Sequence, residues 1–233
     1  MQTKHFGPDE ARDLCSMTGH DAFYWRAVRG SKLIARLTSR VQLPDTVELP
    51  TDRPVIVAAN HSSWFDLMAA LITLGTFGLN ARIGVNSRFF SNPVAGWFLR
   101  GIGCIPFSRE DRESAEQAMV DALDGGQACA MMPEGKIVKL ADRVDGVGAG
   151  RPGISRIARR TGAAILPVGF VHSDRAWLPG KALPRVRLGR DVVTTCIGSP
   201  IELDSDDHEA NAAIVMSSIA ALIAEGYELA AGN

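Results

Sequence analysis

Residues 54–66 read PVIVAANHSSWFD, and this stretch decides how the chain folds. It opens with an apolar run from Val55 to Ala59, which has the length and composition of a strand buried on both faces. Polar residues follow at once, and from about Ser63 to Leu74 the apolar residues have the spacing of a helix. A buried strand that turns directly into a helix is typical of α/β proteins.

The segments after this stretch continue the alternation of strands and helices. We expect further strands at 81–85, 104–107, 128–132, 164–170, 186–188 and 192–197, and helices at 93–100, 112–123, 154–161 and 209–229. A Gly-rich loop at residues 135–150 separates two of them. This order predicts an α/β fold with a largely parallel mixed sheet flanked by helices. In such sheets, ligands bind beyond the carboxyl ends of the strands.

The first 45 residues are predicted to form an N-terminal helical extension to an α/β domain at residues 46–233. We expect one helix at 8–20 and a second at 21–41. One face of the second helix collects its apolar residues, Phe23, Ala27, Gly30, Ile34, Leu37 and Val41. The remaining surface carries five basic residues, Arg26, Arg29, Lys32, Arg36 and Arg40. Two interpretations stay open: a packed helix with a solvated basic back, or a helix resting on anionic lipid.

Composition excludes several classes of protein. A net charge of −1 over 233 residues argues against nucleic-acid binding. The four cysteines, at positions 15, 104, 129 and 196, form no C-x-x-C pair, which disfavours a metal site or a disulfide framework. The apolar surroundings of the last three predict buried free thiols in a reducing compartment.

Neither end of the chain predicts export or insertion. The N-terminal residues include acids and lack an apolar core, so we expect no secretory signal peptide. No stretch reaches the roughly 20 uninterrupted apolar residues that a spanning helix needs, so we expect no transmembrane segment.

The most informative polar cluster is His61 to Asp66, directly after the first buried strand. Five positions apart across a strand-to-helix turn, the Asp66 carboxylate can accept the Nδ1 proton of His61. The imidazole Nε2 is then free to take a proton from a hydroxyl that the substrate brings. Either residue can instead serve only to end the strand or to cap the helix.

Three further clusters follow later strands. Arg109 ends the strand at 104–107 and offers a planar fork that matches phosphate oxygens. Glu134, Gly135 and Lys136 supply a hydroxyl or arginine partner, a close backbone approach and a cation. Arg151 precedes a helix whose N-terminal amides can help to receive an anion. Each cluster can also be an ordinary surface turn.

The order and spacing of these clusters resemble the glycerolipid acyltransferase family, which includes 1-acylglycerol-3-phosphate acyltransferases. His61 and Asp66 fall on its H-x4-D motif, and residues 103–109 look like its second block, which ends in an arginine associated with the acceptor phosphate. Residues 133–135 match its P-E-G block, and residues 165–168 resemble its proline-containing strand. Lys136 and Ser62 differ from the residues usual at their positions, Thr or Ser and Arg or Gln respectively, which leaves the acceptor head group open.

The resemblance implies an O-acyltransferase of phospholipid biosynthesis. It implies that His61 and Asp66 catalyse transfer from acyl-CoA or acyl carrier protein to the hydroxyl of a lysophospholipid such as 1-acyl-glycerol-3-phosphate. Ser63, Arg109, residues 134–136 and Arg151 are then expected to bind substrate. The donor is a co-substrate, and we expect neither a cofactor nor a metal.

The expected partners are a membrane lipid acceptor, an anionic membrane surface and, for one class of donor, acyl carrier protein. The resemblance favours an interfacial role for residues 21–41 and a peripheral position on the cytoplasmic side of the membrane. Three alternatives keep the same fold: transfer to a phosphate-free lyso-aminolipid, a thioesterase, or a lipid-binding protein without catalysis.

Overall fold

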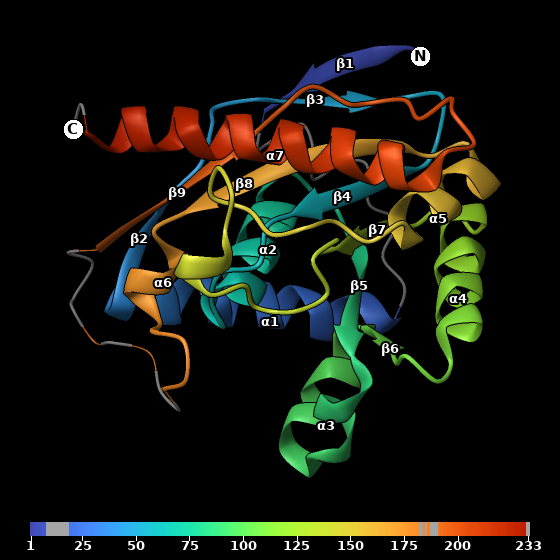
Figure 1. The fold of residues 1–233 in the computed structure, drawn as a ribbon. Helices are drawn as coiled ribbons and strands as arrows, with labels where there is room; N and C mark the ends of the chain where they lie inside the picture. Colours follow the sequence, from blue (N-terminus) through green and yellow to red (C-terminus); the bar gives the residue numbers. More distant parts are fainter. Residues whose placement is uncertain (8–18, 182–183, 185, 187–190, 232–233) are drawn as a thin grey trace.

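A computed structural model describes residues 1–7, 19–181, 184, 186 and 191–231 of the chain. Its main sheet has seven strands in the order β2-β9-β8-β4-β7-β5-β6 (Figure 1). Their bounds are Ser39–Gln42 (β2), Val55–Ala59 (β4), Ala81–Asn86 (β5), Ile105–Phe107 (β6), Ala128–Met131 (β7), Ala164–Val171 (β8) and Asp191–Ile197 (β9). Strands β4 to β8 are parallel to one another, whereas β9 is antiparallel to β8 and carries β2 in parallel. The expected largely parallel mixed sheet is confirmed.

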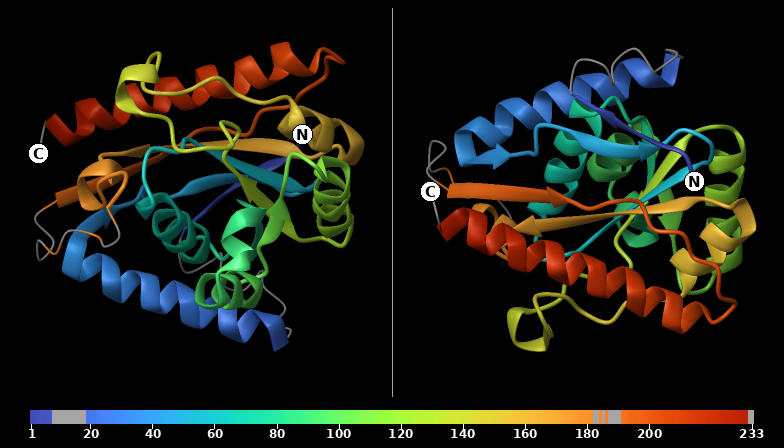
Figure 2. Two further views of the ribbon diagram at one scale, coloured as in Figure 1. Left: turned by 60° about the horizontal axis from the view of Figure 1, so that its bottom comes forward. Right: turned by 90° about the horizontal axis from the view of Figure 1, so that it is seen from above.

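Helices cover both faces of this sheet (Figure 2). One face carries α1 (Gly19–Thr38), α2 (Phe65–Thr76) and α3 (Pro93–Gly101). The other carries α4 (Arg112–Asp124), α5 (Gly153–Thr161) and α7 (His208–Ala231). The apolar residues accordingly form two clusters, one on each side of the sheet.

The central strand β4 explains where the polar residues of the first stretch lie. All five of its residues are buried, and it pairs with β8 on one side and β7 on the other. Because helices cover both faces, a continuous apolar run forms the strand here. The chain therefore emerges at the carboxyl edge in the middle of the sheet, and His61 is the second residue beyond β4.

Helix α1 buries a different face from the one predicted. Its buried residues are Tyr24, Val28, Ser31, Ala35 and Thr38. The prediction was wrong by one residue, about 100° around the helix, because two of these side chains are polar. The Tyr24 hydroxyl donates to the carbonyl of Leu79 at 2.8 Å, and Thr38 donates back to its own helix. Ile34 and Leu37, which were predicted to lie on the apolar face, are exposed instead, and so is Leu33.

The N-terminal segment contributes strands as well as a helix. Strand β1 (Thr3–Phe6) pairs antiparallel with β3 (Val47–Pro50) in a small second sheet, and β2 joins the main sheet. The sequence did not predict these three short strands. The helix expected at 8–20 lies mostly outside the described residues, as does most of the strand expected at 186–188.

Within the described part of the chain, α7 is the helix whose length and composition match those of a membrane span. This finding qualifies the expectation that no such segment exists. One side of α7 is buried against the sheet, through residues that include Val215, Ile219 and Ile223. Helices in the core of water-soluble folds show the same length and apolar content.

Three cysteines, Cys104, Cys129 and Cys196, are buried and free, as predicted. Burial raises the pKa of the first two thiols to about 12 and that of Cys196 to about 11. Cys15 lies outside the described residues.

Candidate active site

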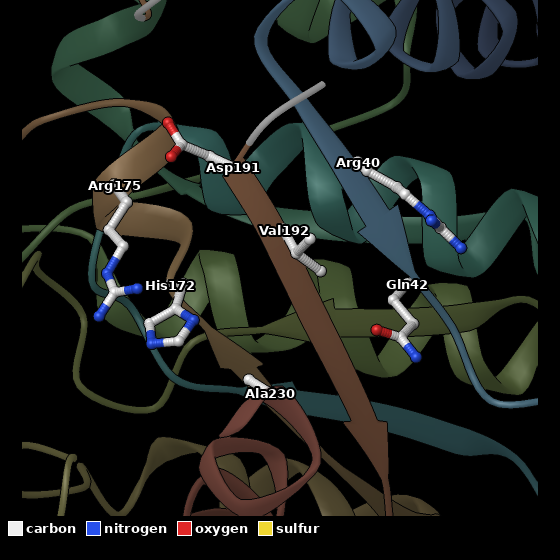
Figure 3. A pocket seen from close by; sticks show the side chains of 7 residues that line it. All are labelled: Arg40, Gln42, His172, Arg175, Asp191, Val192 and Ala230. Atoms are coloured by element: carbon white, nitrogen blue, oxygen red, sulfur yellow. The ribbon is translucent and has the colours of Figure 1, made fainter. Parts of the chain in front are cut away.

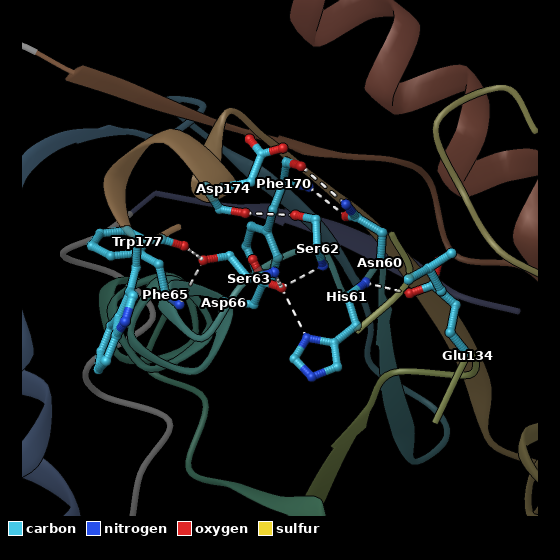
Figure 4. Close-up of polar contacts among 12 residues, drawn as sticks. Asn60, His61, Ser62, Ser63, Phe65, Asp66, Glu134, Phe170, Asp174 and Trp177 are labelled. Carbon is cyan, nitrogen blue, oxygen red and sulfur yellow. Dashed lines mark hydrogen bonds and ion pairs between the residues drawn. The ribbon is translucent and has the colours of Figure 1, made fainter. Parts of the chain in front are cut away.

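The turn after β4 is held to the neighbouring strand by Asn60. Its side-chain amide donates to the Phe170 carbonyl at 3.0 Å and accepts from the Phe170 amide at 2.7 Å (Figure 4). Asn60 therefore continues the pairing of β4 with β8 by one more residue, through its side chain. The next residue, His61, then points out of the sheet edge.

The predicted contact between imidazole and carboxylate is present. His61 Nδ1 lies 2.9 Å from Asp66 Oδ2, and the same oxygen accepts the amides of Ser62 and Ser63, each at 2.7 Å. Asp66 is fully buried, whereas the His61 side chain is 21% exposed. With Nδ1 donating to the carboxylate, Nε2 is the ring atom that is available to an incoming proton.

Ser63 was expected beside the substrate, but the structure places it in the interior. Its side chain is completely buried. The Ser63 hydroxyl donates to the Trp177 carbonyl at 2.6 Å and accepts the Phe65 amide at 3.0 Å, at the start of α2. These contacts make Ser63 a support of the turn, and its hydroxyl has no path to a substrate.

Glu134 is also buried and engages the turn from the other side. One carboxylate oxygen accepts the backbone amide of His61, and the other accepts the amide of Gly148 at 2.7 Å. Burial is the main cause that raises the pKa of Glu134, and the two amides act against it. We expected this carboxylate to meet an acceptor hydroxyl or an arginine, and it meets two backbone amides instead.

The remaining expected residues lie at different places along the carboxyl edge of the sheet. Gly135 has a φ of 66° and sits beneath the Arg151 guanidinium, since a Cβ there would lie 2.9 Å from Arg151 Nε. Lys136 is exposed directly after it. Arg109 is exposed beyond β6, which is three strands from β4 and thus about 14 Å across the sheet. The structure therefore gathers Gly135, Lys136 and Arg151 near the turn and leaves Arg109 at a distance.

A model of the acyltransferase family matches residues 40–171, which is more than half of the chain. The chain belongs to the acyltransferase family. The matched region contains the whole His61 turn, Glu134 and Arg109. The resemblance read from the sequence motifs is confirmed at the level of the family.

Two relatives show how this chain compares with known members of the family. It is 30% identical over 107 residues to the 1-acyl-sn-glycerol-3-phosphate acyltransferase of Bacillus subtilis (strain 168), a match that covers 45% of this chain and 52% of that one. The chain thus spans about half the length of this curated relative. Its fold is similar to the crystal structure of PlsC, the 1-acyl-sn-glycerophosphate (LPA) acyltransferase of Thermotoga maritima, with a TM-score of 0.64 and 20% identity. That match covers 92% of this chain and 85% of PlsC and supports the α/β fold.

One residue of the site was missed in the sequence analysis. The Arg143 side chain is only 7% exposed and donates to the Val138 carbonyl at 3.0 and 3.1 Å and to the Ser62 carbonyl at 3.5 Å. It also pairs with Asp174 at 3.8 Å. The Val138 amide in turn donates to the His61 carbonyl at 3.0 Å, so hydrogen bonds hold the loop at residues 136–150 across the turn. The available signal was a single arginine in a Gly-rich stretch, which specifies no partner.

Four backbone amides, at the His61 turn and at Gly135, already have hydrogen-bond acceptors within the protein. Those of His61, Ser62 and Ser63 donate to buried carboxylates, and the Gly135 amide donates to the Met132 carbonyl at 2.9 Å. The four amides fix the shape of the site and do not face a substrate.

Exchanging Glu134 for glutamine should change how stability depends on pH. Because burial raises the pKa of Glu134, the folded wild type holds a proton that the unfolded chain releases, so its unfolding free energy should fall as pH rises from the ordinary carboxyl pKa to the raised one. Urea unfolding of both proteins at a series of pH values measures this. The Glu134→Gln variant should lack that part of the slope, and identical slopes would contradict the assignment.

A separate hollow of about 500 Å³ lies over the edge of the sheet (Figure 3). Its lining comes from β2, β9, the segment after β8 and the end of α7, and comprises Arg40, Gln42, His172, Arg175, Asp191, Val192 and Ala230. None of these residues belongs to the His61 turn or to the loop at 136–150. Among the described residues, in this hollow or outside it, no group of three His, Cys, Asp or Glu side chains is placed to hold a metal ion.

Proposed function

We propose that this protein is an O-acyltransferase that moves a fatty acyl group from a thioester to the hydroxyl of a lysophospholipid, with 1-acyl-glycerol-3-phosphate as the preferred acceptor. The observation that carries the proposal is the His61–Asp66 contact of 2.9 Å at a partly exposed edge of the sheet. Family membership and the names of the two relatives point to the same chemistry. The donor is acyl-CoA or acyl carrier protein, and both present the same thioester.

The chemistry needs one base and no protein nucleophile. His61 Nε2 removes the proton of the acceptor hydroxyl while the oxygen attacks the thioester carbonyl carbon. The tetrahedral intermediate then collapses, the carbon–sulfur bond breaks, and His61 returns the proton to the departing sulfur. Asp66 keeps the ring oriented and stabilises the imidazolium that exists between the two steps. The products are an ester and a free thiol, so atoms and protons balance.

Thiol release from palmitoyl-CoA, measured with and without lysophosphatidic acid in mixed micelles, tests the proposal. Acceptor-dependent release is the expected result. Release of the same size without acceptor would identify a thioesterase. Absence of release with CoA and carrier-protein donors and with a panel of phosphorylated and phosphate-free lyso-lipids would favour a non-catalytic lipid-binding protein.

The head group is tested through Arg109. If this exposed guanidinium binds the acceptor phosphate, Arg109→Ala should raise the KM for lysophosphatidic acid by about tenfold or more and leave kcat nearly unchanged. Initial rates over a range of acceptor concentrations separate the two constants. Arg160→Ala on α5, which removes another exposed arginine, is the matched control. An unchanged KM for the acceptor would remove the phosphate role from Arg109.

We also propose that α1 rests on an anionic membrane surface. The outward side of this helix carries Leu33, Ile34 and Leu37 together with exposed arginines. Apolar and basic side chains on one helix surface are the composition of interfacial helices. The support is the exposure of these side chains, since the face that packs on α2 is occupied by others.

A further inference from the structure

Between β5 and β6 the chain makes an excursion that projects from the body of the molecule (Figure 1). It consists of the short 3-10 helix η2 (Ser87–Ser91) followed by α3. Asn92 Oδ1 accepts the amides of Val94 and Ala95 at 3.1 and 3.0 Å and so caps α3. Gly96 lies against the Phe90 carbonyl, where a Cβ would collide. The excursion, which we name the η2–α3 projection, therefore has a defined structure of its own.

The projection exposes two large apolar side chains. Val94 is 74% exposed and Trp97 is 63% exposed, and their spacing of three places them on one side of α3. The opposite side is buried through Gly96 and Leu99. The exposed pair belongs to a protruding tip and not to a groove, so a partner has to accept the tip.

The charged residues of the projection itself have one sign. No Asp or Glu occurs between Leu67 and Arg109, whereas the projection carries two exposed arginines, Arg88 and Arg100. Each of them lies over a phenylalanine ring of η2, at 4.6 and 5.9 Å from the ring centroid. An apolar tip with tryptophan and arginine around it is suited to the interface of an anionic bilayer.

Aromatic contacts join the projection to two other parts of the molecule. Trp97 meets Phe23 of α1 with a centroid distance of 5.1 Å, and Phe89 meets Trp64 at 5.1 Å. Trp64 belongs to the turn that carries His61. The projection thus lies between the helix proposed to rest on lipid and the turn proposed to perform the chemistry.

We propose that the η2–α3 projection is a second membrane-contact element, which places Val94 and Trp97 in an anionic bilayer directly beside the His61 turn. The inference rests on the proposed function for its purpose, because a lipid acceptor can then reach His61 while its chain stays in the bilayer. That the projection binds a membrane is inferred from its exposed residues and does not depend on the proposed function. A convex apolar tip fits a deformable lipid surface, and the missing acidic residues favour an anionic one.

The test is co-sedimentation of the full chain with vesicles of mixed phosphatidylglycerol and phosphatidylcholine. Val94→Asp and Trp97→Asp should each lower the partition coefficient by about tenfold or more, because each removes a large apolar side chain from the bilayer. Wild-type binding should also weaken on pure phosphatidylcholine and at high salt. Ile214→Asp on α7 is the matched control, since Ile214 is 50% exposed on a helix that covers the opposite face of the sheet, and it should bind like the wild type.

Val94→Asp decides the question even if Trp97→Asp disturbs the packing of Phe23. An acid in the first turn of a helix favours the helix, so this variant is expected to keep its fold, which circular dichroism verifies. Equal partition of Val94→Asp and wild type would overturn the proposal, as would an equal loss in Ile214→Asp. Absence of wild-type binding to vesicles would overturn the proposal too. That holds also if Val94→Asp is found to break a dimer of the protein.

Failure of this inference can be told apart from failure of the proposed function. If the wild type transfers acyl groups to a short-chain, water-soluble lysophosphatidic acid while Val94→Asp binds vesicles normally, only the projection loses its role. If transfer is absent while Val94→Asp weakens binding, the projection keeps its role and the enzyme assignment falls.

Discussion

Replacing His61 by alanine is expected to lower the rate of acyl transfer by about 10³- to 10⁴-fold. In the proposed reaction the imidazole of His61 is the group that takes and returns the proton. Stability should change by less than about 1 kcal/mol, because the ring is partly exposed and Asp66 retains both of its amide donors. Acceptor-dependent thiol release and the thermal unfolding midpoint measure the two effects.

A histidine outside the site provides the control. His5 lies exposed on β1, and His5→Ala should transfer acyl groups at the wild-type rate. A His61→Ala rate within about tenfold of the wild-type rate would exclude the general-base role. Loss of the folded state in His61→Ala would instead make the residue structural.

Exchanging Asp66 for asparagine should lower kcat by about 10²- to 10³-fold with little change in KM. The asparagine oxygen can take the place of Oδ2 and keep the contacts with Ser62, Ser63 and His61, but the side chain carries no negative charge. The imidazolium that forms between the two proposed steps then loses the carboxylate that stabilises it. Steady-state kinetics with saturating donor distinguish kcat from KM.

Asp121→Asn on α4, where the carboxylate accepts only from Gln117, is the matched control for the charge change. It should leave both constants unaltered. An Asp66→Asn enzyme with wild-type kcat would show that the charge of Asp66 is not needed to stabilise the protonated imidazole of His61. An increase in KM alone would move Asp66 to substrate binding.

The His61 turn was predictable because its parts are local. Asp66 follows His61 by five residues, and the buried strand before them fixes where the turn begins. Long-range contacts were harder to predict. Glu134 was expected to bind substrate or an arginine, yet the partners of its carboxylate depend on how residues 136–150 cross the sheet edge. No local pattern records that path, and Arg143 was missed for the same reason.

Helix α1 shows a second limit. Its length was nearly right, but its buried face includes Ser31 and Thr38, which a pattern of apolar residues leaves out. Val28 fits there because Gly75 on α2 has no side chain to exclude it. The fit between α1 and α2, which lie far apart in the sequence, determines which face of α1 is buried. The positions of the apolar residues within α1 alone do not determine it.

The short strands β1, β2 and β3 were missed because polar residues interrupt each of them. Three of the four residues of β1 are exposed, and β2 begins directly where α1 ends. At that length, pairing with a distant strand determines the structure more than any preference of the residues themselves. The strands that were predicted carry enough apolar residues to be recognised from their own sequence.

Strand β2 gives the N-terminal segment a task unrelated to lipid. It is the outermost strand of the sheet, and residues 39–42 pair with residues 191–194 of β9. Strand β2 ends the sheet with only four residues, one of them Arg40. Without it the sheet would end at the seven residues of β9, a longer open edge to which strands of other molecules can add. A chain shortened to the α/β domain at residue 46 would therefore gain a self-association surface, so the segment protects the protein from aggregation.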